Sequence, residues 1–165
     1  MADDRPHLPA FDLAGFTPYR LAVAAKRTSE ELARQYRARF GISIPEWRVL
    51  VHLAHAGDVS VRDIEARVAM EKYEVSRAAK RLAGAGLIVK RAHEGDRRLV
   101  RLALTAEGEA LMRDLLPLAQ AYQEEIDRRL GAALTGLEAG LDRLLADWEI
   151  PATEGGGRVW HEPEV

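Results

Sequence analysis

The pattern that most constrains this fold is a pair of short helical stretches separated by a tight turn. Ser60, with Asp63 three residues later, is typical of a helix start, where both side chains satisfy free backbone amides. Apolar residues at helical spacing give this first helix one inward face, made of Val61, Ile64 and Val68. A turn over residues 69–72 precedes the second helix. Its inward positions are Val75, Ala79 and Leu82.

The outward positions of the second helix are mostly cationic. They are Lys72, Tyr73, Ser76, Arg77, Lys80 and Arg81. B-form DNA admits a helix into its major groove, and side chains of these types bind phosphates or base edges there. Which of them contact bases and which contact only phosphate stays open. Each cation alone is equally well explained as a solvated surface charge, but four cations together on one helix face favour DNA binding.

Two strand-like runs follow, over residues 87–92 and 99–104, and a polar turn containing glycine joins them. This pattern predicts a β-hairpin, the wing of a winged helix-turn-helix. The tip of the wing offers three candidate DNA contacts, Asp96, Arg97 and Arg98. A carboxylate at this spacing can hold one guanidinium in a fixed direction, which suits a narrow, electronegative minor groove. A hairpin turn with a local salt bridge is the alternative interpretation.

Charge is segregated along the chain in a way that favours nucleic-acid binding. The 165 residues carry a net charge of -2, which alone argues weakly against such a partner. Between residues 72 and 101, however, there are nine Lys or Arg and only three Asp or Glu. From residue 105 onward, thirteen acids outnumber five bases. The acidic C-terminal part therefore masks a basic block of the kind that a phosphate-contacting surface requires.

Longer helical patterns flank the winged unit on both sides. The first runs from Phe16 to Phe40 and has Tyr19, Val23, Leu32, Tyr36 and Phe40 at helical spacing. Within the winged unit, the helix that starts near Pro45 has a predicted apolar stripe of Trp47, Leu50, Val51 and Ala54. The last helix carries Leu137, Leu141, Leu144, Leu145 and Trp148. Because the winged unit has little core of its own, the broad apolar faces of the terminal helices predict a two-fold homodimer.

The sequence thus predicts a mainly α-helical chain with a small β-hairpin wing, a winged helix-turn-helix with N- and C-terminal dimerisation helices. The expected divisions are a flexible arm over 1–14, an N-terminal dimerisation helix over 15–44, a DNA-binding domain over 45–105, C-terminal dimerisation helices over 106–150 and a flexible tail over 151–165.

Composition excludes several functional classes. The chain has no cysteine, which rules out disulfides, thiolate metal sites and thiol-based redox sensing. No segment approaches the roughly 20 apolar residues that span a bilayer, and the first residues lack a hydrophobic signal core, so a cytoplasmic protein without a membrane partner is expected. We find no phosphate-binding loop, nucleophile elbow or metal motif, and therefore expect neither an enzyme nor a cofactor.

A winged helix used only for protein–protein contacts is the remaining alternative, although it would not need cations on both helix and wing.

These motifs resemble the MarR family of transcriptional regulators. The likeness rests on three pieces, namely Pro45–Leu50, then Val75–Leu82 with Gly86–Arg91, then Asp96–Arg98 with Leu102–Thr105 and Gly108. It extends over roughly residues 15–148 with the order and spacing of every element.

The resemblance implies a triangular homodimer whose interface is made by the first and the last two helices. The second helix of the helix-turn-helix would enter the major groove, and Arg98, steadied by Asp96, would enter the minor groove. Such proteins usually repress genes at near-palindromic sites. Many release DNA when a small, often aromatic and anionic, ligand binds between the dimer helices and the winged unit. Others respond to thiol oxidation, which the absence of cysteine excludes here.

Five residues are candidates for binding such a ligand near the helix junction, namely Tyr19, Arg20, Trp47, His52 and Tyr122. A basic side chain there can meet a carboxylate, and an aromatic one can stack on a ring. The alternative is that Trp47 and Tyr19 belong to the core and that His52 is an ordinary helix residue. No metal site is expected, since only His52 and His55 have suitable spacing. The operator, the regulated genes, the direction of regulation and the effector stay open.

Overall fold

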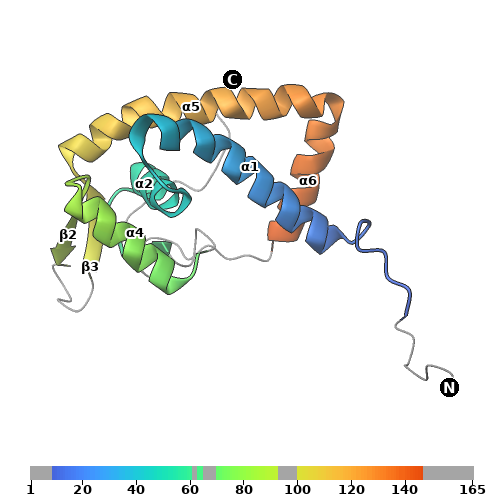
Figure 1. Cartoon of the computed structure of the whole chain (residues 1–165), viewed down its shortest axis with the longest axis horizontal. Coiled ribbons are helices and arrows are strands. Elements are labelled where there is room, and N and C mark those ends of the chain that lie inside the picture. Colours follow the sequence, from blue (N-terminus) through green and yellow to red (C-terminus); the bar gives the residue numbers. More distant parts are fainter. Residues whose placement is uncertain (1–8, 61–62, 65–69, 93–99, 147–165) are drawn as a thin grey trace, which may run out of the picture.

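The computed structural model describes residues 9–60, 63–64, 70–92 and 100–146 and consists mainly of helices with one small sheet. Its elements are α1 (Thr17–Phe40), α2 (Ile44–Ala56), β1 (Val59–Ser60), α4 (Lys72–Gly84), β2 (Ile88–Ala92), β3 (Val100–Leu104), α5 (Ala106–Leu130), the short 3-10 turn η1 (Gly131–Ala133) and α6 (Leu134–Leu145). Figure 1 shows α1 and α5 along one side, the sheet and α4 at one end, and α6 turning back at the other end. The predicted mainly α-helical fold with a small β-hairpin is confirmed, whereas the dimerisation role of the terminal helices stays a prediction.

The core lies where α2, α4 and the sheet pack beneath α1 and α5. The predicted inward residues of α4, Val75, Ala79 and Leu82, are all buried. The predicted stripe on α2 is partly wrong. Val49, Leu50 and Leu53 are the buried apolar residues of this helix, whereas Ala54 is exposed and Trp47 and Val51 are only half-buried. The face that α2 turns to the core is therefore shifted around the helix from the predicted one, towards Val49 and Leu53.

The predicted helix start at Ser60 has the expected geometry. Asp63 N donates to Ser60 Oγ at 3.1 Å, and Ser60 N donates to Asp63 Oδ2 at 3.2 Å, so each side chain satisfies the other's backbone amide. Most of the first helix of the predicted helix-turn-helix lies outside the described residues, although Ile64, one of its inward positions, is fully buried.

The sheet has three antiparallel strands in the order β1-β3-β2. The two predicted strand runs form the hairpin, with Ile88 opposite Leu104 and Arg91 opposite Arg101. The third strand, β1, is an addition that the sequence did not predict, and it pairs Val59 with Leu102. Both Leu102 and Ala103 of β3 are buried. Because successive residues of a strand point to opposite faces, this strand is covered on both faces.

A close packing contact fixes the start of α5 on the loop before β2. Thr105 caps the helix, since its Oγ1 accepts from Gly108 N at 3.0 Å and donates to the Gly86 carbonyl at 2.6 Å. Thr105 N donates to the Leu87 carbonyl at 3.1 Å. A Cβ atom on Gly108 would lie 2.0 Å from that same carbonyl oxygen. Only glycine therefore allows α5 to approach the strand this closely.

We expect Gly108→Ala to destabilise the protein by about 1–3 kcal/mol, since overpacking against backbone forces α5 away from the loop. Gly84→Ala is the matched control, because Gly84 is also helical and nothing lies within 4 Å of its added methyl. That change should leave stability equal or raise it by up to about 1 kcal/mol. Urea denaturation at one fixed protein concentration measures both, and equal effects would contradict the packing argument.

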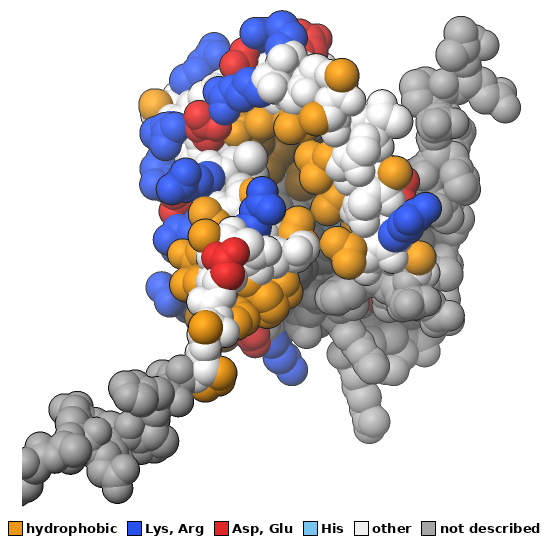
Figure 2. Space-filling view, turned by 90° about the vertical axis from the view of Figure 1, so that its right-hand side faces the viewer, with side chains coloured by type: hydrophobic (Ala, Val, Ile, Leu, Met, Phe, Trp, Pro, Cys, Tyr) orange, Lys and Arg blue, Asp and Glu red, His pale blue; other side chains and the backbone are white. Residues whose placement is uncertain are grey.

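The far end of the molecule leaves apolar side chains uncovered. No residue of η1 or α6 is buried, and Leu137, Leu141, Leu144 and Leu145 are all exposed. A second exposed apolar set lies at and before the start of α1, namely Phe11, Leu13, Phe16 and Tyr19. Figure 2 shows apolar side chains lining a hollow on this end of the molecule. We call these two sets together the uncovered apolar face.

Candidate nucleic-acid interface

Helix α4 presents a polar face to solvent over a fully apolar underside. Val75, Ala78, Ala79 and Leu82 fix the underside in the core. All six outward positions predicted from the sequence are exposed, namely Lys72, Tyr73, Ser76, Arg77, Lys80 and Arg81. The aromatic ring of Tyr73 is notable, because its residue is 62% exposed although a ring of this size is usually better covered. The helix is therefore held rigidly from below and offers mainly cations and hydrogen-bond donors above.

Arg81 is bonded to other side chains of the protein. Its Nε donates to Glu46 Oε1 at 2.8 Å, and its Nη2 donates to Ser43 Oγ at 3.2 Å. Glu46 is only 9% exposed. Burial would raise the pKa of this carboxyl, but hydrogen bonds from Ser43 and the charge of Arg81 outweigh burial and hold the pKa below its usual value. Glu46 is thus ionised at neutral pH and binds Arg81 as a charged partner.

The base of the predicted wing is held by a second set of ionic contacts. Arg91 and Arg101 lie directly opposite each other on β2 and β3, an arrangement that like charges disfavour. Asp58 relieves it, since its carboxylate accepts from Arg91 Nη1 at 3.2 Å while its carbonyl accepts from Arg101. The hairpin is therefore tied to the residue just before β1. The predicted contacts at the wing tip, Asp96, Arg97 and Arg98, lie outside the described residues.

One further cation of this end of the molecule was missed by sequence reasoning. Lys90 is exposed on β2, and Figure 1 shows β2 and α4 at the same end of the molecule, away from α6. Its position inside the basic block of residues 72–101 was the available signal, but a lysine within a strand run carries no motif of its own.

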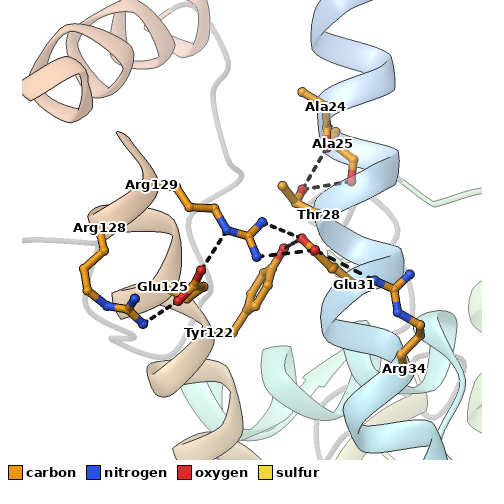
Figure 3. A network of polar contacts seen from close by, with 9 residues as sticks. All are labelled: Ala24, Ala25, Thr28, Glu31, Arg34, Tyr122, Glu125, Arg128 and Arg129. Atoms are coloured by element: carbon orange, nitrogen blue, oxygen red, sulfur yellow. Dashed lines mark hydrogen bonds and ion pairs between the residues drawn. The ribbon is translucent and has the colours of Figure 1, made fainter. Parts of the chain in front are cut away.

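Of the predicted ligand-binding residues, Tyr122 lies in a polar network between α1 and α5, which we call the α1–α5 clasp (Figure 3). Tyr122 Oη donates to Glu31 Oε2 at 2.9 Å, and Arg129 Nη1 donates to the same oxygen at 2.9 Å. Arg129 Nε also donates to Glu125 at 2.9 Å. Two hydrogen bonds lower the pKa of Glu31 below its usual value, and the one from Arg129 has a larger effect than the one from Tyr122. An open pocket of about 490 Å³ lies beside these residues and includes Arg34 and Arg128 in its lining.

The structure does not gather the other four candidates around this pocket. Trp47 stacks on the buried ring of Tyr36, with centroids 5.5 Å apart, and so packs against the core. Tyr19 and Arg20 are exposed near the start of α1. At 1.5 Å per residue, Tyr19 lies about 18 Å along the helix from Glu31 of the clasp. His52 is half-buried on α2.

Comparison with known proteins connects this arrangement to a family. The family model described as MarR family matches residues 40–99. The chain is 30% identical over 106 residues to the HTH-type transcriptional regulator FarR of Neisseria gonorrhoeae, and the alignment covers 62% of this chain and 68% of FarR. None of the helices within the described residues is long and apolar enough to cross a membrane.

Solved structures share the fold over nearly their whole length. BpsR of Bordetella bronchiseptica, whose DNA binding is regulated by 6-hydroxynicotinic acid, superposes with a TM-score of 0.71 at 22% identity, covering 84% of this chain and 99% of BpsR. NadR in complex with 4-hydroxyphenylacetate superposes with a TM-score of 0.70 at 25% identity, covering 85% of this chain and 99% of NadR. From the family match and the likeness to FarR, the chain belongs to the MarR family of transcriptional regulators.

Proposed function

We propose that this regulator binds near-palindromic double-stranded DNA as a homodimer and represses the genes beside its sites. In each half-site α4 enters the major groove. The observation that carries this proposal is the exposed cationic face of α4 above an apolar underside that is completely buried. A helix fixed in this way can present side chains to base edges without having to reorganise on binding.

The side chains of α4 divide by type. Lys72, Arg77 and Lys80 supply charge for phosphates or guanine edges, while Ser76 and Tyr73 supply hydroxyl groups. On the wing we retain Arg98, oriented by Asp96, for the minor groove, with Arg97 and Lys90 towards the phosphates. The ties from Asp58 to the hairpin support this assignment, since they fix the base from which the wing extends.

The homodimer is supported by the uncovered apolar face. Four leucines of α6 and four apolar residues at and before the start of α1 are exposed in the single chain. Patches of this kind mark protein–protein contacts. In a two-fold dimer the same surface serves on both subunits, and two winged units are then spaced to meet two half-sites of one operator.

The test of this function is salt-dependent DNA binding. A suitable probe is the best-bound duplex recovered from a random-sequence library, called here the selected duplex, and binding is followed by fluorescence anisotropy. If a dimer neutralises six or more phosphates, affinity should fall by on the order of a thousandfold between about 50 and 200 mM salt. A response that is flat with salt, or no duplex recovered at all, would favour a protein–protein interaction module.

We propose further that a small aromatic anion releases the DNA. The pocket beside the α1–α5 clasp combines the ring of Tyr122 with the guanidinium groups of Arg34, Arg128 and Arg129. These guanidinium groups pair with Glu31 and Glu125, which also line the pocket, so a ring that bears a carboxylate would bind by replacing one of these glutamates as an arginine's partner. Two similar proteins have ligands of this chemical class, since 6-hydroxynicotinic acid regulates DNA binding by BpsR and 4-hydroxyphenylacetate is bound in the structure of NadR. The same anisotropy assay with either compound added tests the release.

A further inference from the structure

We propose that Arg81 is a positioning residue that fixes the angle of α4 for DNA recognition, and that it makes no contact with DNA itself. The inference rests on the proposed DNA binding by α4. It separates Arg81 from the other cations of the same face. They share its exposure and charge, but of these cations only Arg81 is bonded to other side chains among the described residues.

The geometry joins the last turn of α4 to the first turn of α2. The guanidinium of Arg81 bridges Glu46 Oε1, at 2.8 Å from Nε, and Ser43 Oγ, at 3.2 Å from Nη2. The arginine side chain is 52% exposed, whereas that of Glu46 is only 12% exposed. Because the carboxylate is largely shielded from water, this ion pair is screened less than one on an open surface.

Glu46 is itself held in place and can therefore serve as an anchor. Its Oε2 accepts from Ser43 N at 2.8 Å and from the Ser43 hydroxyl, which caps α2. Val49, Leu50 and Leu53 fix α2 in the core, and the neighbouring Trp47 stacks on Tyr36 of α1. Through Arg81, α4 is thus bonded to α2, which is packed in the core and stacks Trp47 on α1.

A small tilt of α4 about its Arg81 end produces a large displacement of the residues at its other end. Lys72 lies nine residues, or about 13 Å, from Arg81 along the helix. A tilt of about 5° at Arg81 would therefore move Lys72 by about 1 Å, which is enough to disturb bidentate contacts to base edges. Contacts to phosphate by flexible side chains tolerate such a shift better. Loss of the Arg81–Glu46 pair should consequently reduce specificity more than general affinity for DNA.

The experiment compares Arg81→Gln, Glu46→Gln and the double variant on the selected duplex and on a random duplex of equal length. Arg77→Gln is the matched control, because Arg77 is proposed to bind DNA directly. We expect both single variants to lose about tenfold in affinity for the selected duplex and little for the random one. The double variant should be no weaker than either single one, and the salt slope should stay unchanged. Arg77→Gln should instead lower the salt slope by about one for each phosphate that the protein no longer neutralises.

The opposite pattern would overturn the proposal. If Arg81 contacts phosphate, Arg81→Gln weakens both duplexes and lowers the salt slope like Arg77→Gln, whereas Glu46→Gln, which removes a negative charge, binds equally well or better. If thermal melting shows that Glu46→Gln is unfolded, the salt slopes and specificity ratios of Arg81→Gln and Arg77→Gln decide alone. Failure of the native protein to bind any duplex contradicts the proposed function. It is thus distinguishable from the result in which Arg81→Gln behaves like Arg77→Gln, which contradicts only the positioning role of Arg81.

Discussion

Replacing Arg77 and Lys80 together by alanine should lower affinity for the selected duplex at least about a hundredfold. Both side chains are exposed on α4 directly above its buried underside. Removing one side chain that binds a base edge costs about 1–3 kcal/mol, and each substitution acts twice in the proposed dimer. A hundredfold loss of affinity corresponds to about 2.7 kcal/mol, so the expectation holds even if only some of these side chains bind bases. Fluorescence anisotropy at one fixed, moderate salt concentration measures the effect.

The control for this variant removes the same charge elsewhere. Lys26 on α1 and Arg113 on α5 are both largely exposed, and Lys26→Ala with Arg113→Ala changes the net charge by as much as the α4 variant does. Affinity should then change by no more than a few-fold, because long-range attraction is screened over about 10 Å at ordinary salt. Equal losses of affinity in the two double variants would mean that net charge, and not the α4 face, governs binding.

The α4 face and the hairpin were predictable because their signals are local. The inward positions Val75, Ala79 and Leu82 recur at helical spacing, and their burial then determines which side chains of the same helix face solvent. The two hairpin strands likewise carry their own period and are separated by a glycine turn. The strand β1 could not be predicted in this way, because two residues, Val59 and Ser60, are too few to show any period.

The side-chain contacts within the candidate sites were not predictable, because they join distant parts of the chain. Arg81 and Glu46 are separated by 35 residues, and Arg129 and Glu31 by 98. In the sequence Arg81 is one more cation of its helix, and only the fold shows its acidic partner. Trp47 is a similar case. The sequence is equally consistent with an indole that stacks on a ligand, whereas in the structure the indole stacks on the ring of Tyr36.

The homodimer gives the second large effect, which we expect from Leu141→Glu combined with Leu144→Glu. The native protein should show twice the single-chain mass of 18.3 kDa in light scattering at micromolar concentration, and the variant should show that mass itself. Both leucines are exposed on α6 in the single chain, Leu144 by 63%. The dimer would bury them, and each buried unpaired carboxylate costs several kcal/mol, whereas the free subunit leaves it in water.

The position of the new charges on α6, and not their number, should decide whether the protein remains a dimer. Ala139→Glu, within α6, with Ala146→Glu, at the C-cap that continues its helical backbone, places two carboxylates on the opposite side of the helix, since successive residues turn by about 100° around a helix. This control should remain dimeric and bind the selected duplex normally, while the leucine variant should also lose DNA affinity, because a single winged unit meets only one half-site. A leucine variant that stays dimeric would place the interface elsewhere and leave the uncovered apolar face without its proposed partner. A variant that becomes monomeric yet binds DNA as tightly as the native protein would instead separate DNA recognition from dimer formation.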